Sequence, residues 1–195
     1  LSLDGREDVH NAMRPVAGSG ANSYEYIAKN LVNAVKQRHG LEYYVRGTYT
    51  HKNLDFTKDV MAMSDLGFEH LSMEPVVGED GDYVLREEDW PALEKEYEKL
   101  AEIYLERQKE GWGEKFNFFH FRRPCMAKRL RGCGAGHEYM AVVPNGDIYP
   151  CHQFVGKEAY ILGNVYEGLQ NTEIPKDFRN THVFTKPTCA ECWAK

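Results

Sequence analysis

One stretch, residues 133–151, constrains this chain more than any other. It reads CGAGHEYMAVVPNGDIYPC, with a cysteine at each end and the turn residues Asn145 and Gly146 between two apolar runs. Asn-Gly in such a setting is the strongest short-range signal for a β-hairpin with a type I′ turn, in which both central residues have positive φ. We therefore expect a two-stranded hairpin that brings the thiols of Cys133 and Cys151 close together.

A second pair of cysteines, Cys189 and Cys192, follows as a C-x-x-C. This spacing allows two thiolates to bind one metal centre, and soft sulfur ligands suit iron–sulfur clusters. Zinc is the main rival, because four thiolates also form a tetrahedral zinc site. Zinc ribbons use two C-x-x-C knuckles, however, and Cys133 and Cys151 are too widely spaced for a knuckle. The spacing therefore favours iron–sulfur chemistry over a structural zinc ion.

The pattern C-x12-G-x4-C made by Cys133, Gly146 and Cys151, followed by the C-x-x-C, resembles the first half of the SPASM motif. That motif binds auxiliary iron–sulfur clusters in radical S-adenosylmethionine enzymes that modify peptides and proteins. The stretch GCGAGHEYMAVVPNGDIYPCHQFVG most resembles the corresponding segment of the maturases of six-cysteine peptides, which form thioether bridges. The resemblance extends over essentially the whole chain.

The resemblance also implies a set of metal ligands. It assigns Cys133 and Cys151 to one auxiliary [4Fe-4S] cluster, and Cys189 and Cys192 to another. It further suggests Cys125 as an extra ligand of the first cluster, and a buried or substrate-facing thiol is the equally weighted alternative for that residue. Each cluster needs three or four thiolates, so neither set is complete within these cysteines.

Composition limits the class of protein. The 195 residues carry a net charge of −6, which argues against a general nucleic-acid binder. No apolar run approaches the length of a membrane span. All five cysteines lie after residue 124, which fits a metal site in a reducing, cytoplasmic compartment better than a disulfide framework.

Strand and helix patterns alternate through the first part of the chain. Strand patterns cover residues 43–49, 69–74 and 116–121, and helical periodicity covers 27–35, 57–66 and 93–105. Alternation of this kind predicts parallel strands with helices packed outside, which also fits half of an open doubly wound sheet. The resemblance implies instead the C-terminal half of a partial (β/α)6 radical-SAM barrel at 1–121. A small cysteine-rich α+β SPASM domain with a β-hairpin is then expected at 122–195.

Three local signals predict where the helices begin. Asn22 with Glu25 resembles a capping box, Thr57 is a candidate cap for a short helix, and Asp89 precedes a long helix. These positions divide the first part into strand–helix units.

Polar residues near the predicted strand ends are candidates for cofactor binding. Ser2-Leu3-Asp4-Gly5 and the later Arg14 resemble a segment that contacts S-adenosylmethionine in SPASM-type enzymes. The resemblance implies that Ser2, Asp4, Arg14 and Arg46 bind this cofactor. A guanidinium can hold its carboxylate through two hydrogen bonds. The alternative is a strand end with a surface arginine.

Catalytic sites of such barrels lie at the carboxyl ends of the strands. Thr50 and Glu74 are therefore the expected cavity residues, together with Asn53 after the first of these strands. No catalytic residue is assigned from the sequence.

The resemblance implies a peptide maturase that forms thioether cross-links in a cysteine-rich precursor peptide. Its cofactors would be [4Fe-4S] clusters and S-adenosylmethionine, and its electron donor a ferredoxin or flavodoxin. The chain has no C-x3-C-x2-C for a catalytic cluster, so we expect it to be part of a longer enzyme and to be inactive alone. The alternatives are a formylglycine-forming, sulfatase-maturating enzyme and a zinc-stabilised peptide-binding module without catalysis.

Overall fold

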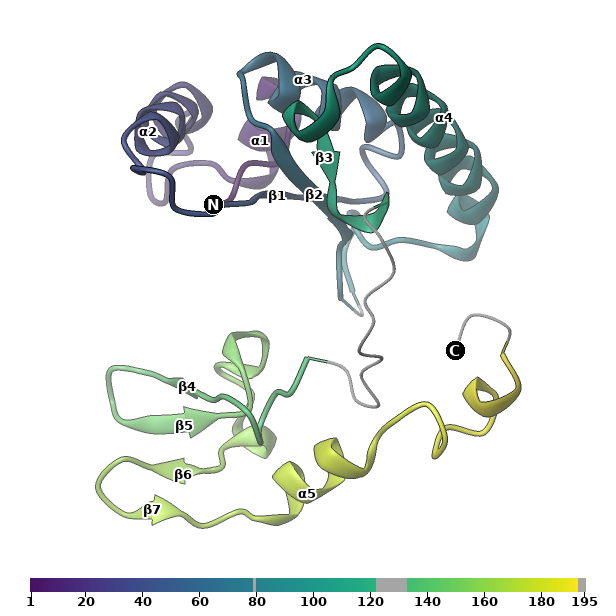
Figure 1. Ribbon diagram of the computed structural model, residues 1–195. Helices are drawn as coiled ribbons and strands as arrows, with labels where there is room; N and C mark the ends of the chain where they lie inside the picture. Colours follow the sequence, from purple (N-terminus) through teal and green to yellow (C-terminus); the bar gives the residue numbers. More distant parts are fainter. Residues whose placement is uncertain (79, 122–132, 193–195) are drawn as a thin grey trace. The chain divides into compact units, whose positions relative to one another are not determined.

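The computed structural model describes residues 1–78, 80–121 and 133–192 of the chain. By its internal contacts the chain divides into two compact units, Leu1–Pro124 and Cys125–Lys195 (Figure 1). Within the described ranges, no helix is both long enough and apolar enough to cross a membrane. Cys125 lies outside the described residues, so its predicted role as a ligand stays a prediction.

The first unit contains a parallel three-stranded sheet in the order β1-β2-β3, with β2 at the centre. Its helices and strands are α1 (Glu7–Met13), α2 (Tyr24–Lys36), β1 (Val45–Tyr49), α3 (Thr57–Asp65), β2 (His70–Pro75), α4 (Trp90–Lys109) and β3 (Asn117–Phe118). Short 3₁₀ helices lie at Glu87–Asp89, Gly113–Lys115 and Phe119–Phe121. The predicted alternation of strands and helices is therefore confirmed, although the third strand keeps only two of its six predicted residues.

A fourth parallel segment lies beside β1. Ser2 pairs with Arg46 in a parallel bridge, and the backbone N–H groups of Leu3 and Arg46 donate to the carbonyls of Arg46 and Leu1. Gly47 makes this close approach possible, because a Cβ at this position would lie 2.8 Å from the carbonyl oxygen of Leu3. The segment Ser2-Leu3-Asp4-Gly5 thus runs from a strand-like pairing with β1 into a loop, as predicted.

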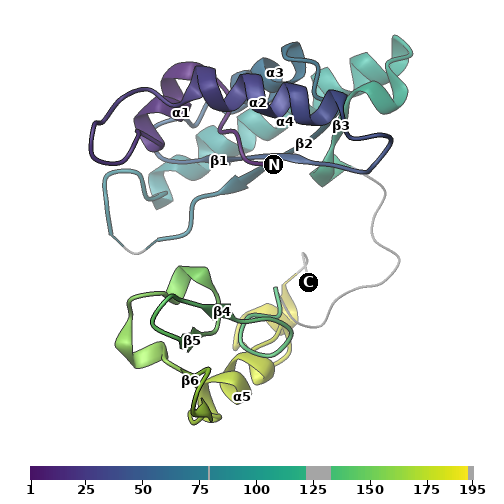
Figure 2. The same cartoon turned by 90° about the vertical axis from the view of Figure 1, so that its left-hand side faces the viewer.

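The four helices of this unit lie on one face of the sheet (Figures 1 and 2). Alternate strand residues, among them Val45, Leu71 and Met73, are fully buried in the core beneath the helices. Because strand side chains alternate between faces, Arg46, Thr48, Ser72 and Glu74 belong to the opposite face. On that polar face Ser72 is buried, and Thr48 and Glu74 are half-buried.

Two helix caps differ from the predictions because distant residues provide the hydrogen bonds. The carboxamide oxygen of Asn11 accepts the backbone N–H groups of Ser23 and Tyr24, both at 2.9 Å, so α1 caps α2 and the capping box predicted at Asn22 is wrong. The hydroxyl of Thr57 donates to the carbonyl of Glu96 in α4 and does not cap α3. Neither long-range contact is visible from local spacing.

The second unit is a four-stranded antiparallel meander followed by a short helix. Its elements are β4 (Ala141–Val142), β5 (Asp147–Tyr149), β6 (Gly163–Asn164), β7 (Gly168–Leu169) and α5 (Glu173–Asn180). Short 3₁₀ helices lie at His152–Phe154, Glu158–Tyr160 and Cys189–Glu191. Ala141 pairs with Tyr149 and Val142 with Ile148, which confirms the predicted hairpin.

The hairpin turn is not of type I′. Asn145 does not have positive φ, whereas Gly146 has φ +92°. The N–H of Gly146 donates to the carbonyl of Val143 at 2.8 Å, so Pro144 occupies the first central position of the turn. Proline fixes φ near −65°, which excludes the positive φ that a primed turn requires. The result is a longer loop in which glycine follows the turn in the left-handed conformation.

Candidate functional site

Cys133 and Cys151 line one cavity of about 290 Å³ in the second unit. The cavity wall also includes Gly134, Ala135, His137, Gln153, Phe154, Phe178, Thr181 and Lys186. Cys151 is buried directly after β5, and Cys133 is exposed at the start of the loop that leads to β4. The two cysteines thus line the same cavity, at the two ends of the segment that contains the predicted hairpin.

The surroundings of Cys133 favour its thiolate. The backbone N–H of Ala135 and the hydroxyl of Tyr139 donate hydrogen bonds that hold the pKa of the Cys133 thiol below its ordinary value, against burial and the charge of Glu138. The same hydrogen bond, with burial and the charges of Cys133 and Cys151, raises the pKa of Tyr139 to about 12. Donors around a thiolate stabilise the ionised form that binds metals.

Cys189 and Cys192 lie at the two ends of a tight turn. Cys189 begins a short 3₁₀ helix, and the N–H of Cys192 donates to the carbonyl of Cys189 at 3.2 Å. Neither residue lines the cavity of Cys133 and Cys151. In the part of the chain that the structure describes, no three His, Cys, Asp or Glu side chains are placed to hold one metal ion.

The residues at the cavity fit a thiolate-bound iron–sulfur cluster. They provide two thiols, donor groups directed at one sulfur, and aromatic walls from Phe154 and Phe178. Gly134 and Gly136 have φ of +81° and +77°, and both are buried beside Cys133, where a Cβ would meet Glu138 and Phe178 respectively. Ligands of a four-iron cluster bind different iron atoms, so they need not surround a single point.

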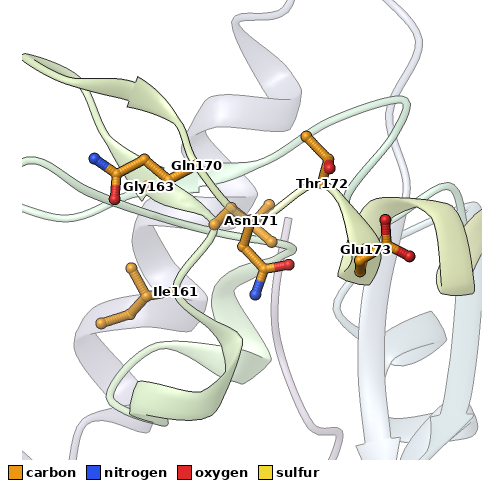
Figure 3. Close-up of a pocket in the computed structure, with 7 residues that line it drawn as sticks. Ile161, Gly163, Gln170, Asn171, Thr172 and Glu173 are labelled. Atoms are coloured by element: carbon orange, nitrogen blue, oxygen red, sulfur yellow. The ribbon is translucent and has the colours of Figure 1, made fainter.

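Three other hollows in the described part of the second unit have linings without a thiol. One, of about 390 Å³, is lined by the segment from Ile161 to Gly163 and by residues 170–173 (Figure 3). There the backbone N–H groups of Gln170 and Asn171 both donate to the carbonyl of Leu162. Its lining contains no thiol and no histidine, so we assign it no metal chemistry.

In the first unit, the four predicted cofactor residues form two contacting pairs. Ser2 is paired with Arg46, and both are exposed. The carboxylate of Asp4 is buried and accepts the N–H of Thr48 at 3.1 Å. Arg14 donates to both oxygens of Asp4, which raises the pKa of Arg14. The structure thus gives Arg14 a protein carboxylate as partner, which the sequence did not predict.

Thr50 and Asn53, the residues expected near a cavity, lie in an internal polar network. Both are buried, and the N–H and hydroxyl of Thr50 donate to the carboxamide oxygen of Asn53 at 2.8 Å. Asn53 in turn donates to Asp59, which also binds Arg6. The polar residues after β1 therefore form an internal network that fixes the strand end.

Glu74 lies at the carboxyl end of β2, within a network that the sequence only partly indicated. Its Oε1 accepts the hydroxyl of Ser72 at 3.0 Å and lies 3.2 Å from Nε2 of His120. Nδ1 of His120 lies 3.4 Å from the hydroxyl of Tyr97, which lies 3.4 Å from that of Tyr49. His120 was missed because it follows β3 and no local spacing relates it to Glu74.

The cysteine-bearing unit is similar to a known family. Residues 133–193 match the SPASM family, which is described as an iron–sulfur cluster-binding domain. No curated protein matches the sequence.

Three solved structures share the fold at low sequence identity. Hexahistidine-tagged anSMEcpe with bound AdoMet is 18% identical with a TM-score of 0.67, and the match covers 91% of this chain and 49% of that one. Native anSMEcpe with bound AdoMet is 18% identical with a TM-score of 0.69, covering 99% and 55%. Native anSMEcpe with AdoMet and the Cp18Cys peptide is 19% identical with a TM-score of 0.57, covering 93% and 50%. The chain therefore spans about half the length of these structures.

Proposed function

We propose that these residues belong to a radical S-adenosylmethionine enzyme that forms thioether bridges in a cysteine-rich peptide. The observation that carries the proposal is the shared cavity of Cys133 and Cys151 inside the segment that matches the iron–sulfur cluster-binding family. The α/β fold shared with anSMEcpe supports it. In this proposal, Leu1–Pro124 is half of a partial barrel and Cys125–Lys195 is the cluster-binding domain.

Cys133 and Cys151 would hold one auxiliary cluster, with Cys125 as a candidate further ligand, and Cys189 and Cys192 would belong to another. Bound clusters would supply one-electron chemistry, for which a ferredoxin or flavodoxin is the expected donor. The hydrogen bonds at Cys133 favour its ionised form, so this residue is prepared to act as a ligand. Phe154 and Phe178 give the cavity an aromatic wall.

The edge made by Ser2 and Arg46, with Arg14 nearby, would bind S-adenosylmethionine. Arg14 uses Nε and one amino group to hold Asp4, so a cofactor carboxylate would bind its other amino group. Asp4 would act mainly by orienting Arg14, because its own carboxylate is buried and hydrogen-bonded. This division of roles refines the expectation that both residues touch the cofactor.

Glu74 would face the peptide from the side of the sheet opposite the four α-helices. Ser72 and His120 hold its Oε1, which leaves Oε2 to accept a hydrogen bond from a substrate donor. In the described residues, the one ion pair of Glu74 is with His120. Glu74 would therefore orient the peptide.

The test is co-expression of the complete enzyme with the cysteine-rich peptide encoded beside its gene, followed by mass spectrometry of the peptide. A thioether bridge removes two hydrogens and protects the bridged cysteine from alkylation. Formylglycine formation is the second candidate, favoured by the structural similarity to anSMEcpe bound to the Cp18Cys peptide. It would instead introduce an aldehyde that reacts with hydrazides. An unmodified peptide would contradict both.

A further inference from the structure

His137 shares one cavity with Cys133 and Cys151, which we call the thiol cavity. Among the described residues that line it, His137 is the one residue besides the two cysteines whose side chain is a common metal ligand. Two thiols alone do not complete an iron–sulfur cluster, which needs three or four ligands. A nitrogen ligand in this cavity would therefore fill a place that neither thiol takes.

The loop that carries His137 fixes both its backbone and its ring. The N–H of His137 donates to the carbonyl of Gly134 at 3.2 Å. The N–H of Gly136 donates to the carbonyl of Pro150 at 2.9 Å, which ties the loop to the end of β5. Nδ1 of His137 lies 3.1 Å from the carbonyl oxygen of Ala135. Because a carbonyl only accepts hydrogen bonds, Nδ1 carries the proton, and Nε2 of the neutral ring keeps its lone pair.

Nε2 of His137 is buried and has no hydrogen-bond partner among the described residues. The side chain of His137 is only 8% exposed. Oε1 of Glu138 lies 4.0 Å from Nε2, which is too far for a hydrogen bond, and the Glu138 side chain is 56% exposed. A group that binds at Nε2 would explain why this buried nitrogen is left without a partner.

His137 also lines a second hollow, of about 410 Å³, whose wall includes Glu173 and Lys176 of α5. The lining of that hollow contains no cysteine. Of the two spaces that His137 lines, the thiol cavity is therefore the one that offers further ligands for iron.

We infer that His137 ligates iron through Nε2 in the iron–sulfur cluster of the thiol cavity, beside Cys133 and Cys151. The inference rests on the proposed function, since it requires a cluster at this cavity. The described residues place no three such side chains around a single point, and a cluster does not require this because its ligands bind different iron atoms. A metal-bound imidazole usually donates its other N–H to a carbonyl or carboxylate, as Nδ1 of His137 does to Ala135.

A histidine ligand has a consequence for the reduction potential. A neutral imidazole adds no negative charge to the cluster, whereas a thiolate does, and clusters with histidine ligands have higher potentials than those bound by cysteine alone. A thiolate in place of His137 should therefore make the cluster harder to reduce.

The test uses the complete enzyme with ¹⁵N-labelled histidine, reconstituted anaerobically, reduced, and studied by pulsed electron paramagnetic resonance. A histidine nitrogen bound to iron gives a much larger ¹⁵N coupling than one that only forms a hydrogen bond. His137→Asn keeps a side-chain N–H for the carbonyl of Ala135 and removes Nε2, and His137→Cys offers a thiolate instead. His182→Gln is the control, because Nδ1 of His182 accepts the N–H of Phe184 and the residue lies outside the lining of the thiol cavity.

We expect the large coupling in the wild type and in His182→Gln, and its loss in His137→Asn. His137→Cys should keep wild-type iron, lose the coupling and shift the midpoint potential of the cluster to more negative values. A wild-type enzyme that binds iron but shows no large coupling would overturn the inference and leave the proposed function intact. A coupling that persists in either His137 variant would also overturn it, because another histidine would then be the ligand. A wild-type enzyme that binds no iron would overturn the inference together with the proposed function.

Discussion

The guanidinium of Arg14, at the end of α1, forms a two-point hydrogen-bonded pair with the buried carboxylate of Asp4. The side chain of Asp4 is 2% exposed and that of Arg14 is 46% exposed. Asp4 also accepts the N–H of Thr48 in β1. The pair therefore connects three parts of the first unit: the segment at residues 1–4, strand β1 and helix α1. The arrangement links the stability of the first unit to the residues proposed to bind S-adenosylmethionine.

Arg14→Ala should destabilise the first unit. The substitution leaves a buried carboxylate with the N–H of Thr48 and no cation, which should lower the free energy of unfolding by about 1–3 kcal/mol. Urea unfolding followed by circular dichroism measures this change. Arg86→Ala is the control, because Arg86 pairs with Glu88 at the surface and should cost less than about 1 kcal/mol. Equal stabilities of the two variants would contradict the role given to Asp4.

Gly47→Ala should destabilise the same unit by overpacking. A Cβ at this position would lie 2.4 Å from the sulfur of Met73 and 2.8 Å from the carbonyl oxygen of Leu3. The Met73 side chain can move, but the Leu3 backbone is hydrogen-bonded to β1, so we expect a loss of about 1–3 kcal/mol. Thermal unfolding gives the comparison, and an unchanged midpoint would show that the strands can separate without cost.

The acid dependence of stability should include a contribution from Asp55. Hydrogen bonding from Arg6, with Lys58 nearby, lowers the pKa of Asp55 to about 2 in the folded chain, against its burial. An unfolded aspartate titrates near about 3.9. The contribution of ionised Asp55 to the free energy of unfolding is therefore complete above about pH 4. It is lost as the pH falls from about 4 toward about 2.

Asp55→Asn removes this contribution, so the stability gap between wild type and the variant should be largest near neutral pH and shrink in acid. Urea unfolding at several pH values measures the gap. Asp8→Asn, at an exposed position of α1, serves as a control for the loss of one negative charge. A gap that stays constant across the acid range would rule out the Arg6–Asp55 pair as its source.

Gly146→Val should disturb the cluster site although Gly146 binds no metal. Gly146 has φ +92°, and a Cβ there would lie 2.9 Å from the carboxamide oxygen of Asn164. The strain, of about 1–3 kcal/mol, would shift β5 and hence Cys151. Gly156→Val is the matched control, since Gly156 also has positive φ but faces open space outside the hairpin. We expect Gly146→Val to bind less iron than Gly156→Val. Equal iron in the two variants would contradict the idea that the turn controls the position of Cys151.

The elements that local patterns control could be predicted from the sequence. Helix α4 begins after Asp89 and the hairpin turns at residues 144–146, because capping, proline and glycine act over a few residues. The turn type was wrong because the proline restriction outweighs the preference of Asn-Gly for a primed turn. The local rule was right about the hairpin and wrong about its geometry.

Much of the candidate site depends on contacts that no local pattern records. Asn11 caps a helix that begins thirteen residues later. His120 follows β3 and contacts Glu74 at the end of the neighbouring strand β2. The loop between Cys133 and Tyr139 folds back on itself because its glycines permit positive φ. Cysteine spacing indicated which thiols meet, but not which groups surround them.

The most direct test of the central claim is metal and sulfide analysis of the anaerobically reconstituted complete enzyme, with Cys133→Ala and Cys151→Ala beside the wild type. Our account predicts iron and labile sulfide in the wild type and a clear loss of both in each variant, because each thiolate is a charged ligand without a local substitute. One zinc ion with no iron in the wild type, or unchanged iron in both variants, would contradict the assignment of an iron–sulfur cluster to this cavity.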